Sequence, residues 1–107
     1  LMHKVSISQE KAIKEISGAA RDNELEIINL NAAEKRPYAN SPAGFAIDEV
    51  PLSMHVTGGY RKIGEFLLRL HGDFPVLVRV VRLTMKGKGH GGNILDADLQ
   101  LIAYVKR

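Results

Sequence analysis

Apolar and polar residues alternate most regularly near the end of the chain, over residues 94–105. A period of two is typical of a strand that buries one face of its sheet and exposes the other. The predicted inward face holds Leu95, Ala97, Leu99, Leu101, Ala103 and Val105. The predicted outward face holds Asp96, Asp98, Gln100 and Tyr104. We therefore expect a strand of a sheet that is covered on one side.

Residues 49–57 alternate in the same way and predict a second strand. One face holds Leu52, Met54 and Val56, and the other holds Ser53, His55 and Thr57. Pro51 has no backbone N–H, so it favours an edge strand or the first residues of a strand. Gly58 and Gly59 are predicted to end this strand.

The alternation over residues 76–86 changes parity once. The apolar positions are Val78 and Val80 before the change, and Leu83 and Met85 after it. A β-bulge near Val81 and Arg82 would place all four side chains on one face. A strand buried on both faces is the alternative.

Apolar residues recur at helical spacing in two segments. Residues 8–22 carry a narrow stripe around Ile13 and Ile16, with Ser6 or Ser8 as the N-terminal cap. Residues 60–71 carry a cleaner stripe, formed by Tyr60, Ile63, Phe66, Leu67 and Leu70. Gly72 suits the position that follows a helix.

Residues 24–31 are predicted to form another strand and residues 32–47 a long loop. The glycine-rich residues 87–92 are predicted to join the last two strands as a hairpin. The order is therefore helix–strand–strand, repeated once. It predicts a single α+β domain over residues 1–107, a two-layer ferredoxin-like sandwich in αββ-αββ order. A four-stranded antiparallel sheet would carry two helices on one face.

Length and composition exclude several classes of protein. A chain of 107 residues that is 45% hydrophobic fits one folded domain and is too apolar for a disordered segment. It has no cysteine, which excludes a disulfide scaffold and a thiolate metal site. It contains no run of 18 apolar residues and no recognisable signal peptide.

The net charge of +3 is unevenly distributed. Residues 61–90 carry two acidic residues, Glu65 and Asp73, against seven basic ones. The basic residues are Arg61, Lys62, Arg69, Arg79, Arg82, Lys86 and Lys88. Such a segment could contact a nucleic-acid backbone. A solvated helix face and a charged hairpin are the favoured interpretation.

No residues form a recognisable catalytic, metal or cofactor site. The glycine-rich loop around Lys88 lacks the strand–helix context of a phosphate-binding loop. The chain has four histidines, and their spacing is not that of metal ligands: His3, His55, His71 and His90. The paired carboxylates at 24 and 26, and at 96 and 98, lie on predicted solvent faces. We therefore expect no enzyme activity, no cofactor and no metal.

One stretch, residues 50–105, resembles the PilO family of type IV pilus inner-membrane assembly proteins. The resemblance lies in a strand, a glycine, an amphipathic helix, a turn with proline and a closing strand pair. It is carried by Val56, Gly58, Tyr60, Ile63, Phe66, Leu67, Leu70 and Pro75. In this pattern Gly58 would allow a turn with positive φ. The helix residues would pack on the sheet, and Pro75 would stiffen the entry to the next strand.

The resemblance implies the non-enzymatic, periplasmic C-terminal domain of an inner-membrane protein. An N-terminal transmembrane helix and a coiled coil would precede this domain in the whole protein. The resemblance also implies homodimers, and heterodimers with a PilN-like protein, within the pilus alignment subcomplex. The similar GspM proteins of type II secretion are the near alternative. A soluble ferredoxin-like module that binds a ligand or nucleic acid is the rival from another class.

Three apolar residues are candidates for the dimer interface, provided that they lie opposite the packed helices. They are Leu77, Val81 and Ile102. Such an interface would typically bury on the order of 800 Å² on each partner.

Overall fold

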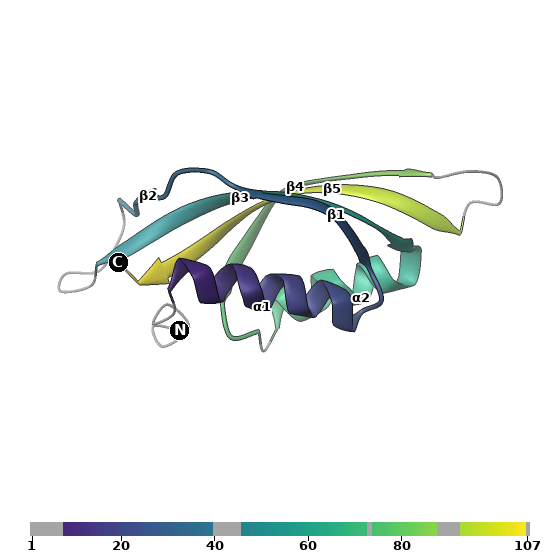
Figure 1. The fold of residues 1–107 in the computed structure, drawn as a ribbon, viewed down its shortest axis with the longest axis horizontal. Coiled ribbons are helices and arrows are strands. Elements are labelled where there is room, and N and C mark those ends of the chain that lie inside the picture. Colours follow the sequence, from purple (N-terminus) through teal and green to yellow (C-terminus); the bar gives the residue numbers. More distant parts are fainter. Residues whose placement is uncertain (1–7, 40–45, 73, 88–92, 107) are drawn as a thin grey trace.

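The computed structural model describes residues 8–39, 46–72, 74–87 and 93–106. Two helices lie on one face of a five-stranded antiparallel sheet (Figure 1). The helices are α1 (Gln9–Asp22) and α2 (Tyr60–His71). The strands are β1 (Glu26–Ala32), β2 (Arg36–Pro37), β3 (Ile47–Gly59), β4 (Leu77–Gly87) and β5 (Ile94–Lys106). The sheet order is β1-β3-β5-β4, and β2 also pairs with β3.

The predicted α+β class is confirmed, but the sheet has five strands rather than the predicted four. The additional strand β2 lies inside the predicted 32–47 loop, where Arg36 and Pro37 pair with Glu49 and Asp48. Two residues are too few to show an alternating pattern, so the sequence gives no sign of this strand. The ferredoxin-like geometry stays a prediction.

The two central strands, β3 and β5, form the longest pair in the sheet. They run antiparallel without a register shift from Ile47 opposite Lys106 to Gly59 opposite Ile94. The strand therefore ends at this glycine pair as predicted, but it includes both glycines instead of stopping at Thr57. Gly59 keeps an extended backbone, with φ −70° and ψ 149°, and directly precedes α2. The strand thus leads directly into the helix, which begins at Tyr60.

Pro51 lies within this central strand, against the expectation of an edge or a strand start. Its carbonyl oxygen accepts a hydrogen bond from the backbone N–H of Ala33, at 2.8 Å, on the β1 side. In an antiparallel strand the nitrogen of the same residue points to that side too. Pairing of β1 ends at Leu52, and pairing of β2 ends at Glu49. Pro51 therefore lies just past the last residue paired with β1, and its nitrogen, which carries no hydrogen, faces that side of the strand rather than β5.

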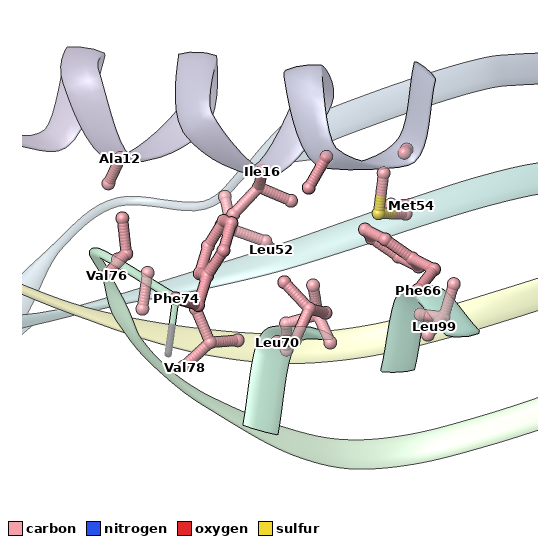
Figure 2. Close-up of a cluster of buried hydrophobic side chains, with 14 of the residues drawn as sticks. Ala12, Ile16, Leu52, Met54, Phe66, Leu70, Phe74, Val76, Val78 and Leu99 are labelled. Carbon is pink, nitrogen blue, oxygen red and sulfur yellow. The ribbon is translucent and has the colours of Figure 1, made fainter. Parts of the chain in front are cut away.

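The core lies between the helices and the sheet, where Phe66 and Phe74 sit among aliphatic side chains (Figure 2). The predicted inward faces of β3 and β5 are confirmed, since both rows are buried there except for the partly buried Leu95. Helix α1 buries Ala12, Ile16, Ala19 and Ala20. Three of these four side chains are methyl groups, so α1 can lie close to the sheet. Ser8 caps α1 by accepting a hydrogen bond from the Lys11 N–H, at 3.3 Å.

Helix α2 packs through Ile63, Phe66 and Leu70, with Leu67 at the margin of the core. Tyr60 was expected in this stripe, but its residue surface is 68% exposed. At about 100° per residue, Tyr60 lies to one side of the direction defined by the three buried residues. It is also the first residue of the helix, at the end of the sheet. Its predicted packing role is therefore wrong.

The predicted bulge in the third long strand is confirmed. The pairing of β4 with β5 shifts register between Val80 and Arg82, which leaves Val81 as the extra residue. The four apolar residues Val78, Val80, Leu83 and Met85 consequently lie opposite the inward row of β5. The alternative of a strand buried on both faces does not hold.

Strand β1 begins two residues later than predicted. Glu24 has φ 61°, a left-handed conformation that turns the chain between α1 and β1. Leu25 follows and is buried. A register shift between Ile27 and Asn29 leaves Ile28 exposed, an irregularity that the sequence pattern did not reveal.

Gly58 is needed for close packing and not for a turn. Its φ lies outside the left-handed region, so the predicted turn with positive φ is wrong. A Cβ atom at this position would instead overlap the Cδ2 atom of Leu25. Leu25 is 3% exposed and has little room to move. Gly58 therefore lets the start of β1 lie against β3.

We predict that Gly58→Ala lowers the free energy of unfolding by about 1–3 kcal/mol, because it overpacks the site of Leu25. Gly64→Ala is the matched control. A Cβ at this helical position meets nothing within 4 Å, so alanine should raise stability by about 0.5–1 kcal/mol. Urea unfolding of both variants measures these changes. Equal stability of Gly58→Ala and the wild type would contradict the packing role.

Candidate protein interface on the open face of the sheet

The sheet face opposite the helices is not covered by either helix (Figure 1). We call this surface the open face. It is formed by alternate residues of the four long strands, and most of them are polar. Its central residues are Asn29, Asn31, Ser53, His55, Arg79, Arg82, Thr84, Lys86, Asp98 and Gln100.

One corner of the open face is apolar. Ile47, Ile102 and Tyr104 are buried there, with Tyr38 and Leu77 packed against them. The rings of Tyr38 and Tyr104 meet edge to face, with centroids 5.1 Å apart. The Tyr38 N–H donates to the Ile47 carbonyl at 2.9 Å and holds this segment against β3. The segment after β2 therefore covers the corner.

The three candidate interface residues do not form one exposed patch. Leu77 and Ile102 belong to the covered corner, where Ile102 is 6% exposed. Val81 is the bulge residue of β4 and is 54% exposed. Their role in an interface stays a prediction, but Val81 alone of the three offers substantial free surface.

A histidine between two carboxylates lies near the centre of the open face. His55 on β3 is directly opposite Asp98 on β5, and their Nδ1 and Oδ1 atoms are 2.7 Å apart. The other ring nitrogen, Nε2, is 3.3 Å from the Oδ1 atom of Asp96. The Thr57 hydroxyl donates to this same Asp96 oxygen at 2.7 Å. The register of the central strand pair thus assembles a polar network from residues about 40 positions apart.

This network raises the pKa of His55 above its ordinary value of 6.5. The hydrogen bond with Asp98 is the main cause, followed by the one with Asp96. The folded protein therefore binds the proton on His55 more tightly than the unfolded chain. The resulting stabilisation is complete below the unfolded pKa and is lost as the pH rises through the folded pKa.

We predict that the melting temperature advantage of the wild type over His55→Asn is larger at pH 5.5 than at pH 8.5. Asp98→Asn in the wild-type background should reduce this pH dependence of the melting temperature. The same substitution in the His55→Asn background should have little effect on the pH dependence. Thermal unfolding at the two pH values measures this cycle. An advantage that is independent of pH would show that the network does not control the protonation of His55.

A shallow depression of about 320 Å³ crosses the open face beside this network. Its polar lining is Asn29, Ser53, Arg82, Thr84, Asp98 and Gln100. These side chains can donate and accept hydrogen bonds. Among the described residues, no group of three or more His, Cys, Asp or Glu side chains could hold a metal ion. The depression is therefore suited to polar contacts with another molecule.

The basic segment 61–90 does not form one surface. Lys62 and Arg69 of α2 pair with Glu24 and Asp22, at 3.5 Å in each case. Three other basic residues lie on β4 with their side chains on the open face, on the opposite side of the molecule from α2. They are Arg79, Arg82 and Lys86. Lys88 lies outside the described residues, as do His3, His90 and most of the 87–92 hairpin.

The remaining residues of the PilO-like pattern have structural positions. Val56 and Gly58 lie on β3, and Ile63, Phe66 and Leu70 hold α2 on the sheet. Pro75 is exposed in the bend directly before β4, and its role in stiffening the strand entry stays a prediction. Sequence reasoning identified His55, Asp96 and Asp98 separately but not their contact, because that contact depends on the register of distant strands.

These features define a two-layer α+β domain with a covered and an open sheet face. Among the described residues no helix is long and apolar enough to cross a membrane. No protein-family model matches the sequence, and no curated protein sequence matches it either.

Solved structures with the same fold do exist. The type 4 fimbrial biogenesis protein PilO from Pseudomonas aeruginosa matches with a TM-score of 0.73 at 16% identity, over 92% of this chain and 69% of that one. The core region of PilO from the type IV pilus system of the same organism matches with a TM-score of 0.66 at 18% identity. That match covers 89% of this chain and 91% of the PilO core.

A third structure comes from Akkermansia muciniphila and was solved without its transmembrane region. It matches with a TM-score of 0.70 at 13% identity, over 91% of this chain and 59% of that one. At these identities the likeness concerns the fold. The resemblance to PilO inferred from residues 50–105 is confirmed at this level, and it extends over nearly the whole described chain.

Proposed function

We propose that this chain is a structural domain of a type IV pilus assembly machinery. The observation that carries the proposal is the agreement of two independent lines. The sequence pattern of residues 50–105 resembles PilO, and the fold superimposes on a PilO protein over 92% of the chain. Two of the matching structures are PilO proteins of type IV pilus systems, and a scaffold role requires no catalytic group.

In this proposal the domain faces the periplasm and belongs to an inner-membrane protein. Two of the three matching structures described above are longer than this chain, which covers 69% and 59% of them. A membrane anchor in the whole protein would restrict the domain to partners close to the membrane. The domain would then act by binding, as a homodimer and as a heterodimer with a PilN-like protein of the alignment subcomplex.

The open face supports a binding role. It combines hydrogen-bonding side chains, a shallow depression and an exposed strand edge, and no helix covers it. Interfaces of this polar kind are typical of partners that also exist separately. The ferredoxin-like interpretation of the fold belongs to the same proposal, since it relates the two helix–strand–strand units to each other.

The test is deletion of the encoding gene in its own bacterium, with complementation by the intact gene. We predict loss of surface pili and of twitching motility, both restored by complementation, while type II protein secretion is unchanged. Electron microscopy, a motility assay and a secretion assay provide the three readouts. Normal pili would contradict the proposal, and normal pili with failed secretion would favour the GspM-like alternative.

A further inference from the structure

We propose that the outer edge of β4 binds a strand of a partner protein in which acidic and apolar residues alternate. The partner strand would extend the sheet by backbone hydrogen bonds. This inference rests on the proposed scaffold role, because it names the surface through which such a domain would bind.

The outer edge of β4 is unpaired within the described part of the chain. β4 is the last strand in the order β1-β3-β5-β4, and it pairs only with β5. It is 11 residues long, Leu77–Gly87, and contains no proline. Such an edge presents a row of unused backbone donors and acceptors, which is a template for another strand.

The charged side chains of β4 on the open face are all basic. We call Arg79, Arg82 and Lys86 the basic row. All three are exposed. None of the ion pairs among the described residues involves them. Opposite charges on directly paired residues stabilise a sheet, whereas like charges destabilise it. An added strand should therefore carry carboxylates on this face.

The other face of the same edge is apolar. Leu83 is partly buried at the margin of the core, and Met85 is 42% exposed. Leu67 of α2 is also partly buried at the margin of the core. It lies about 140–160° around the helix from Lys62 and Arg69, which face α1 and β1. Leu67 is therefore on the β4 side, and an added strand could bury apolar side chains against these three residues.

These two faces together specify the partner and disfavour a second copy of β4. Pairing two β4 edges would bring two basic rows together. Charged residues and a bulge also protect a free edge from aggregation. Protection alone, however, requires neither charges of a single sign nor an apolar strip along the other face. A strand that alternates acidic with apolar residues satisfies both faces at once.

The test uses a ten-residue peptide of alternating valine and glutamate, titrated into the 107-residue protein and followed by NMR. We expect binding, with the shifted amide signals concentrated in β4. The double variant Arg79→Glu/Arg82→Glu should weaken binding by about tenfold or more. Arg61→Glu on the outer side of α2 is the matched control and should bind as the wild type does. Circular dichroism establishes that each variant is folded.

Two further peptides separate strand pairing from simple charge attraction. A valine–lysine peptide should bind the wild type much more weakly than the valine–glutamate peptide. N-methylation of every second backbone amide removes hydrogen-bond donors but keeps the charges. Two such peptides can be made, one methylated at the odd-numbered and one at the even-numbered residues. The peptide whose methyl groups point toward β4 should not bind. The inference is overturned if no binding occurs at millimolar peptide, if both methylated peptides bind normally, or if the shifts lie outside β4.

These outcomes are independent of the pilus test. Peptide binding at β4 combined with normal pili after gene deletion would retain the edge site and remove the proposed pilus role. Absence of peptide binding combined with loss of pili would retain the proposed pilus role and remove the edge site.

Discussion

The pairing of β3 with β5 is the interaction on which the rest of the structure depends. Each strand has 13 residues, and they stay in register from end to end. Their inward rows form the floor of the core under both helices, and their outward rows bring His55 to Asp98. Every other strand attaches to this pair: β1 and β2 to β3, and β4 to β5. A shift of one residue would exchange the buried and exposed rows, so the alternating pattern strongly fixes the register.

Periodic features could be predicted from the sequence, whereas features set by distant contacts could not. The alternation in β3 and β5, the stripe of α2 and the bulge at Val81 are all local patterns. The two-residue strand β2, the irregularity at Ile28 and the contact of Gly58 with Leu25 depend on segments far apart in the chain. Tyr60 lies to one side of the buried stripe of α2 and at the first residue of the helix, at the end of the sheet. The spacing of apolar residues shows which side of a helix is buried, but it does not show how far the sheet extends beneath that helix.

The same distinction applies to the candidate interface. The sequence identified the basic residues of 61–90, but the fold separates them onto opposite sides of the molecule. Ion pairs with Glu24 and Asp22 occupy Lys62 and Arg69 on the helix side, while the basic row stays on the open face. The three basic residues of β4 therefore share one surface, whereas the basic residues of α2 lie on the other side of the molecule. The apolar corner around Tyr104 could not be predicted from the sequence either. It depends on the contact of Tyr104 with Tyr38, which directly follows the short strand β2.

Amide hydrogen exchange of the protein alone tests the central claim most directly, namely that a stable β3–β5 pair supports a free β4 edge. The account predicts the slowest exchange in β3 and β5. In β4 it predicts alternating behaviour, with amides that bond to β5 protected and the amides between them exchanging rapidly. Uniform protection along β4 would mean that its outer edge is already paired in solution, and this result would contradict the account.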